Sequence, residues 1–212
     1  MDFSFIRDLE ENLQGELPGP EAQYRMAHVA RQGYREVPPT ARQAGVLALL
    51  YPRGNQWHIV LIERVNNQQD RHSGQVSFPG GRREQSDPTL AATALREAEE
   101  EVGVYAEHIR LLGPLTSLYI PVSNYNVQPF VGFTERAPSF RPEMQEVQSI
   151  LEVPFPLFLN KETVRTRHLP LNEQVILRDV PYYHVFDKTV WGATAMMLSE
   201  LVEVAQPIQN EK

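Results

Sequence analysis

Short apolar runs separated by turn-forming residues dominate the middle of the chain. Residues 44–51 (AGVLALLY) and 57–64 (WHIVLIER) are two such runs, joined by a Pro-Arg-Gly-Asn segment. Their lengths and the turn between them predict a hairpin of two core strands. The same pattern predicts further strands at residues 75–78, 109–120, 126–134, 164–169 and 175–186.

Helical periodicity marks the two ends of the chain. Phe3, Ile6, Leu9 and Leu13 recur at helical spacing, which predicts an amphipathic helix within residues 3–17. A second short helix is expected over residues 21–31, and a final one opens at residues 189–195 and runs through Val204. We expect an N-terminal helical extension (residues 1–37), a main domain (38–206) and a short tail (207–212). The extension could cover the sheet or support a dimer, and packing is the favoured role.

A central helix is expected from Asp87 to Gly103. Asp87 suits the N-cap, Pro88 suits the first turn because it lacks an N–H, and Gly103 suits the left-handed position that ends a helix. An apolar stripe that should pack on a sheet is formed by Ala91, Leu95, Ala98 and Val102.

Three carboxylates share one face of this helix. At roughly 100° per residue, Glu97, Glu100 and Glu101 point to the same side, whereas Glu99 points elsewhere. Like charges near a helix C-terminus repel one another and the helix dipole, so a cation should compensate them. Arg96 can reach Glu100, and the remaining oxygens suit Mg²⁺ or Mn²⁺. The alternative is a solvated acidic face without a ligand.

A glycine pair precedes the helix and favours the metal site over the solvated acidic face. Gly80 and Gly81 allow the backbone to approach a metal or a phosphate closely, because no side chain blocks it. Five arginines lie near this segment in sequence, and guanidinium groups bind phosphate with two N–H groups at once. We expect one or two of them to contact a substrate; they are Arg64, Arg71, Arg82, Arg83 and Arg96.

Residues 81–104 resemble the Nudix box, Gly-x5-Glu-x7-Arg-Glu-U-x-Glu-Glu-x-Gly-U, where U is a bulky apolar residue. Asp87 stands where the first Glu is expected, and eight residues rather than seven separate it from Arg96. The resemblance implies an α/β fold, the Nudix-type α/β/α sandwich with a mixed β-sheet between helices. It also implies metal-dependent hydrolysis of a pyrophosphate bond.

The resemblance assigns roles residue by residue. The metal, Mg²⁺ or Mn²⁺, would be held by Glu97, Glu100, Glu101 and a carbonyl of the glycine pair, for which Gly81 is the candidate. Nudix enzymes commonly add a glutamate from a late loop. Glu146 is the candidate and Glu143 the runner-up, and a surface role for both stays open. The candidate catalytic residues are therefore Arg96, Glu97, Glu100, Glu101 and Glu146.

Residues 74–81 (GQVSFPGG) are similar to a motif of the coenzyme A pyrophosphatase branch, as is the Trp-Gly-x-Thr-Ala segment that begins at Trp191. Val65 and one extra residue before Gly74 depart from that motif. The resemblance implies cleavage of coenzyme A or an acyl-coenzyme A to phosphopantetheine and adenosine 3′,5′-bisphosphate. Candidate substrate-binding residues are Arg64, Arg71, His72, Gly80 and Gly81.

Other functions stay open at this point. ADP-ribose, NADH or another nucleoside diphosphate derivative could be the substrate, and a nucleotide-binding regulator without turnover is a non-enzyme alternative. The formal net charge of −7 argues against nucleic-acid polymers as partners. No apolar stretch is long enough for a membrane span, and the absence of cysteine fits a cytoplasmic location. A homodimer is left open.

Overall fold

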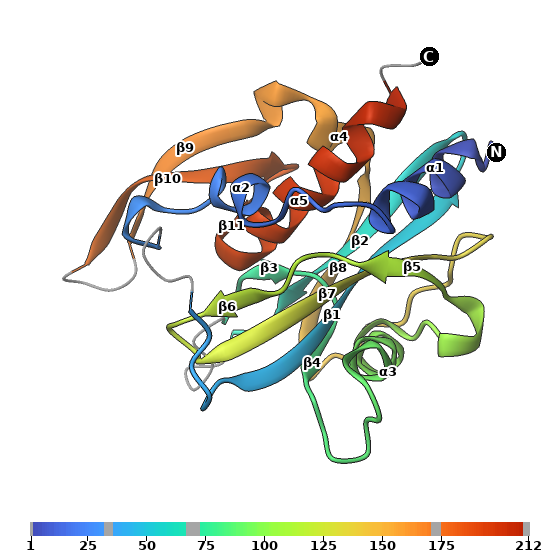
Figure 1. Cartoon of the computed structure of the whole chain (residues 1–212), viewed down its shortest axis with the longest axis horizontal. Helices are drawn as coiled ribbons and strands as arrows, with labels where there is room; N and C mark the ends of the chain where they lie inside the picture. Colours follow the sequence, from blue (N-terminus) through green and yellow to red (C-terminus); the bar gives the residue numbers. More distant parts are fainter. Residues whose placement is uncertain (1, 32–35, 67–72, 171–174, 210–212) are drawn as a thin grey trace.

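The computed structural model describes residues 2–31, 36–66, 73–170 and 175–209. A mixed β-sheet crosses the molecule between two helical layers (Figure 1). Helix α3 (Leu90–Val102) covers one face, while α1 (Ser4–Leu13), α2 (Gly19–Tyr24) and α5 (Gly192–Gln209) cover the other. This arrangement confirms the α/β/α sandwich expected from the sequence.

The expected hairpin forms the middle of this sheet. Strands β1 (Arg42–Arg53) and β2 (Gln56–Arg64) pair antiparallel, and β7 (Tyr125–Phe133) pairs parallel to β1. The remaining pairings are antiparallel. They place β8 (Val147–Pro154) and β3 (Val76–Ser77) beside β2, β4 (Gly80–Arg82) beside β1, and β5 (Arg110–Pro114) and β6 (Leu118–Ile120) beside β7. The single strand expected over residues 109–120 is therefore two strands.

The sheet buries side chains on both faces, which explains why β1 is a nearly continuous apolar run. Successive side chains of a strand point to opposite sides. Leu47 and Leu49 pack toward Ala94 and Ala98 of α3, whereas the side chains that alternate with them, such as Leu50, join the core under α1 and α5. The sheet is thus the common wall of two hydrophobic cores.

The N-terminal helix belongs to the larger of these cores. Phe5, Ile6, Leu9 and Leu13 are buried there, as the helical spacing predicts. The second expected helix is shorter than expected: α2 ends at Tyr24, and a 3₁₀ turn (Val29–Arg31) follows. Gln23 of α2 donates from Nε2 to Glu200 of α5 at 2.8 Å. The first helices therefore pack on the domain rather than projecting from it.

A separate three-stranded antiparallel sheet lies beside α5 (Figure 1). It consists of β9 (Val164–Pro170), β10 (Ile176–Val185) and β11 (Lys188–Trp191). The final helix was expected to open at residue 189 but begins at Gly192. The β-branched and aromatic residues of β11 favour a strand, and Gly192 turns the chain with a positive φ of 63°. Helix α4 (Pro156–Leu159) and 3₁₀ turns at Ala106–His108 and Lys161–Thr163 complete the elements. None of the described helices is both long and apolar enough to cross a bilayer.

Candidate functional site

Helix α3 begins two residues later than the sequence suggests. Its N-cap is Thr89, whose Oγ1 accepts a hydrogen bond from the backbone N–H of Ala92 at 3.1 Å. The assignment of Asp87 as the cap is therefore wrong, because a hydroxyl nearer to the first turn takes that role. The expected end is confirmed: Gly103 adopts the left-handed conformation with φ 71°.

Asp87 has a different partner, the guanidinium of Arg96. Nε and Nη2 of Arg96 donate to the two carboxylate oxygens of Asp87, both at 3.1 Å. Asp87 is only 5% exposed. The hydrogen bonds from Arg96 hold the pKa of Asp87 at about 2, against the smaller opposing effect of burial. The ion pair of Asp87 with Arg96 thus joins the segment before α3 to the middle of the helix.

Arg96 also organises two glutamates of the acidic run. Its Nη1 lies 2.7 Å from Oε2 of Glu100, which confirms the expected contact one turn along the helix. Its Nη2 lies 2.8 Å from Oε1 of Glu97. The side chain of Glu100 remains 57% exposed, and Glu99 is exposed as expected.

The buried face of α3 is rotated relative to the expected stripe. Ala98 and Val102 are buried, but Ala91 and Leu95 are only partly buried. Thr93 and Glu101 take buried positions instead, together with Ala94. The Thr93 hydroxyl donates to Asp87 at 3.0 Å, so a polar contact holds this face. The apolar periodicity of the sequence did not predict this contact, because it carries no information about buried polar pairs.

Glu101 is the buried carboxylate of the acidic run, with only 1% of its surface exposed. Its Oε2 accepts a hydrogen bond from the backbone N–H of Gly80 at 2.8 Å, and its Oε1 lies 3.4 Å from Nη1 of Arg64. Burial raises the pKa of Glu101 to about 8, and these two contacts offset that effect only in part. The charged form of Glu101 is therefore poorly compensated by the protein alone.

Glu97 packs directly against the glycine turn. A Cβ atom added to Gly81 would lie 2.5 Å from the carboxyl carbon of Glu97, closer than real side chains approach. Only glycine fits at position 81 without moving that carboxylate. Burial is the main effect on Glu97 and raises its pKa. The glycine pair and the acidic helix thus form one surface.

The segment before β8 brings Glu146 to this surface. The negative charge of Glu146 contributes to raising the pKa of both Glu97 and Glu101. Glu143 donates its backbone N–H to the carbonyl of Glu101 at 3.0 Å, and Val65 donates to the carbonyl of Glu146 at 3.0 Å. A strand, β8, follows Glu146, and its first residue, Val147, pairs with Arg64 of β2.

The remaining candidate residues have fewer contacts in the structure or lie outside the residues that it describes. The side chain of Glu143 accepts from the N–H of Gln145 at 3.1 Å, within its own turn. Arg64 points to Glu101. Arg71 and His72 lie outside the described residues.

The acidic side chains are not arranged as a closed metal site. Within residues 2–31, 36–66, 73–170 and 175–209, no three acidic or histidine side chains converge as metal ligands would. The carboxylates of Glu97, Glu100 and Glu101 instead face Arg96, Arg64 and the N–H of Gly80. The donor types do fit Mg²⁺ or Mn²⁺, which prefer carboxylate and carbonyl oxygens. The poorly compensated charge of Glu101 also favours a cation.

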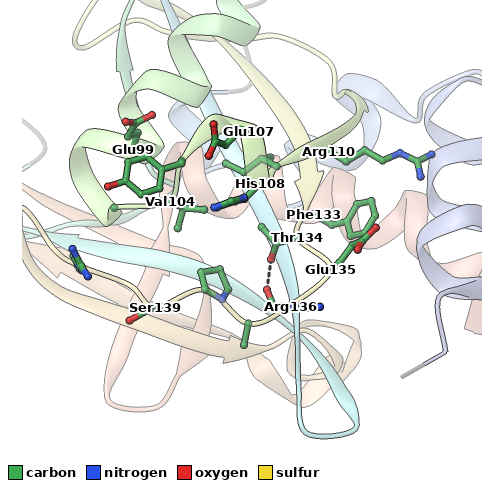
Figure 2. Close-up of a pocket in the computed structure, with 16 residues that line it drawn as sticks. Glu99, Val104, Glu107, His108, Arg110, Phe133, Thr134, Glu135, Arg136 and Ser139 are labelled. Atoms are coloured by element: carbon green, nitrogen blue, oxygen red, sulfur yellow. Dashed lines mark hydrogen bonds between the residues drawn. The ribbon is translucent and has the colours of Figure 1, made fainter.

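A large pocket lies away from this surface. It measures about 1050 Å³ and is bounded by the C-terminal end of α3, residues 105–110 and residues 133–141. Figure 2 shows Glu99, His108 and Arg136 around it. Among the acidic residues of α3, Glu99 alone lines it. A smaller pocket of about 420 Å³ lies beside Gly81, at Arg42, Arg82 and Arg83.

Comparison with known proteins places the chain among hydrolases that act on pyrophosphate bonds. The NUDIX domain model matches residues 41–182. The chain is 35% identical to an uncharacterized Nudix hydrolase, NudL, of Pectobacterium atrosepticum, over 76% of this chain and 81% of that protein. It is 30% identical to NudL of Yersinia pestis over 94% of each. A MutT/nudix family protein from Enterococcus faecalis has a similar fold, with a TM-score of 0.53 at 17% identity, covering 88% of this chain and 73% of that one. The chain therefore belongs to the Nudix hydrolase family, whose members generally use divalent metal ions.

Proposed function

We propose that this Nudix hydrolase cleaves the pyrophosphate bond of coenzyme A or an acyl-coenzyme A. The products are phosphopantetheine, or its acyl form, and adenosine 3′,5′-bisphosphate. The observation that carries the proposed site is the contact of Glu97 and Glu101 with the glycine pair, since it sets one partly buried and one buried carboxylate beside a backbone without side chains. The choice of coenzyme A is supported by the GQVSFPGG run and by the Trp-Gly-x-Thr-Ala segment.

In this proposal Glu97, Glu100, Glu101 and the carbonyl of Gly81 would hold Mg²⁺ or Mn²⁺. When bound there, the ion would supply Lewis-acid polarisation of the phosphorus centre and would lower the pKa of the attacking water. Arg96 holds Glu97 and Glu100 in place through its two ion pairs. Glu146 is exposed and close to Glu97 and Glu101, so its carboxylate can accept a proton from the attacking water.

Substrate contacts are assigned to the backbone and to nearby cations. Gly80 and Gly81 carry no side chain that would block an anionic ligand, and Arg64 supplies positive charge beside Glu101. Arg71 and His72 remain candidates on the sequence alone. Positive charge close to the carboxylates favours a phosphate-bearing substrate, because guanidinium groups bind phosphate with good geometry.

Two other functions compete with this one. ADP-ribose, NADH or another nucleoside diphosphate derivative contains the same pyrophosphate bond. The Nudix box is expected to select that bond irrespective of the attached group. A nucleotide-binding regulator would retain the fold without turnover. The intact residues Arg96, Glu97, Glu100 and Glu101 argue against the regulator.

The proposal is tested by measuring kcat/KM for coenzyme A, acetyl-coenzyme A, ADP-ribose and NADH, each with Mg²⁺ and with Mn²⁺. Coenzyme A or its acetyl form should give the highest value, with adenosine 3′,5′-bisphosphate as product. A higher value for ADP-ribose or NADH would reject the coenzyme A assignment. Absence of hydrolysis for every substrate would support the regulator.

A matched pair of variants tests the assignment of the late glutamate. Glu146→Gln should lower kcat by about 10²-fold or more, as expected for loss of a general base. Glu143→Gln is the control, since its side chain is bonded within its own turn. Equal effects of the two substitutions would remove Glu146 from the proposed mechanism.

A further inference from the structure

The smaller pocket begins one residue beyond the glycine pair. It measures about 420 Å³ and is lined by Arg42, Gln43, Arg82, Arg83, Glu84 and Gln85. Strand β4 places it there, because Gly81 and Arg82 pair with Gly45 and Ala44 of β1. A strand advances about 3.3 Å per residue. Arg82 therefore lies one residue along β4 from the surface that Glu97 and Gly81 form.

Two of the three guanidinium groups at this pocket are held by neutral acceptors. Arg83 donates from Nε and Nη2 to the carbonyl of Asp87, at 3.2 and 3.1 Å, and from Nη2 to that of Pro88 at 3.1 Å. Arg42 donates to the carbonyl of Ser123 at 2.7 Å. The guanidinium carbon of Arg42 also lies 4.3 Å from the ring centroid of Tyr125. These contacts fix the positions of both cations but do not neutralise their charge.

The charge of this pocket is therefore largely uncompensated. Within the part of the chain that the structure describes, Arg42, Arg82 and Arg83 form no ion pair with a carboxylate. The acidic residue that lines the pocket is Glu84, whose Oε2 accepts a hydrogen bond from the hydroxyl of Ser86 at 3.5 Å. Arg64 and Arg96, by contrast, are paired with acidic side chains. Three arginines and one glutamate give the lining of this pocket a net positive charge, which attracts an anion.

The pocket is large enough to hold a phosphate group. Pockets that enclose drug-sized ligands measure roughly 300–1,000 Å³, so this one is at the small end of that range. Guanidinium groups match the geometry of phosphate oxygens and bind them through paired N–H groups. A phosphate group bound here would belong to a substrate whose pyrophosphate lies at Gly80 and Gly81.

We propose that the pocket formed by Arg42, Arg82 and Arg83 binds a phosphate monoester that the substrate carries in addition to its pyrophosphate. This inference rests on the proposed function and deepens it. Coenzyme A carries such a group at the 3′ position, and NADPH carries one at the 2′ position. ADP-ribose and NADH carry none, so the pocket selects between the two kinds of substrate.

The test compares kcat/KM for coenzyme A with kcat/KM for dephospho-coenzyme A in three proteins. A charge-assisted contact is worth roughly ten- to a hundredfold, so the wild type should prefer coenzyme A by about that factor. Arg82→Gln should reduce this preference several-fold. Arg136→Gln is the matched control, because Arg136 lines the large pocket and also has no carboxylate partner among the described residues. It should leave the preference unchanged.

Two results would overturn the inference. One is an equal kcat/KM for the two substrates in the wild type. The other is a preference that survives both Arg82→Gln and Arg42→Gln but is lost in Arg71→Ala, which would assign the phosphate to the segment before Gly74.

A binding experiment separates this inference from the proposed function. Calorimetry without metal compares adenosine 3′,5′-bisphosphate with AMP, using wild type and Arg82→Gln. Tighter binding of the bisphosphate to the wild type, with the difference lost in Arg82→Gln, supports the pocket even if coenzyme A is not cleaved. Equal affinities reject the pocket even if coenzyme A is cleaved.

Discussion

Two buried carboxylates beside α3 differ in how their charge is compensated. Asp87, 5% exposed, faces the guanidinium of Arg96, and its pKa is held at about 2. Glu101, 1% exposed, has the N–H of Gly80 and a longer contact to Arg64, and its pKa rises to about 8. Burial sets the direction of the pKa shift of Glu101, whereas the hydrogen bonds from Arg96 outweigh burial at Asp87. We infer that Asp87 stabilises the fold, whereas Glu101 is held ready for a cation.

The largest expected effect is on turnover by Glu101→Gln. Removing the charge while keeping the shape should lower kcat/KM by about 10²- to 10⁴-fold, as for loss of a group that acts in the transition state. The same change should leave the melting temperature of the metal-free protein unchanged or higher at pH 7.5, because the buried charge is poorly compensated. Steady-state kinetics and thermal unfolding measure the two effects.

Glu99→Gln is the control for that substitution. Glu99 is exposed, so the activity and the stability of the Glu99→Gln protein should stay near wild-type values. A fully active Glu101→Gln protein would remove Glu101 from the proposed metal site.

Asp87→Asn should lower the stability of the protein more than its activity, the reverse of what is expected for Glu101→Gln. It removes the most buried of the three carboxylates that pair with Arg96, and breaking a buried pair costs about 3 kcal/mol of unfolding free energy. Urea unfolding at pH 7 measures the loss. Activity should fall less than in Glu101→Gln, since Arg96 keeps Glu97 and Glu100 as partners. Unchanged stability would mean that the ion pair is not needed for the fold.

Divalent ions should stabilise the wild type by binding the folded state. At a concentration of 100 times Kd, the gain is about 2.7 kcal/mol. Thermal unfolding with Mg²⁺ or Mn²⁺ should show a rise that is lost in the triple variant Glu97→Gln, Glu100→Gln, Glu101→Gln. An equal rise in the triple variant would place the bound ion elsewhere.

The smallest effect is the pH dependence that Asp87 contributes. Its pKa is lowered in the folded state, from about 3.9 in an unfolded chain to about 2. Its stabilisation is therefore complete above pH 4 and is lost as the pH falls through 2. Between pH 5 and pH 2 the wild type should lose roughly 2 kcal/mol more than Asp87→Asn. Unfolding of both proteins across this range checks the sign, and parallel curves would contradict it.

The central hairpin, the end of α3 and the contact from Arg96 to Glu100 followed from the sequence. Each depends on neighbours along the chain, and local periodicity and glycine preferences report such neighbours well. The same local rules placed the N-cap at Asp87. A long-range pairing with Arg96 outweighed that preference, and Thr89 capped the helix.

Contacts between distant segments could not be predicted in this way. Arg42 lies about 40 residues before Arg82, and only the pairing of β1 with β4 brings them to one pocket. Likewise, Val147 starts a strand after Glu146 because β2 offers a free edge there. Pairing between strands, which apolar periodicity does not encode, decided both outcomes.

The parallel pairing of β1 with β7 has a consequence for how the protein folds. Paired residues such as Arg42 and Tyr125 are roughly 80 residues apart, and both the glycine turn and α3 lie in the chain between them. Contacts of such high sequence separation form slowly, because the entropy of closing a long loop must be overcome first. The acidic helix can form locally, but its docking against Gly80 and Gly81 needs the sheet. We therefore expect catalytic competence to appear late in refolding, together with closure of this loop.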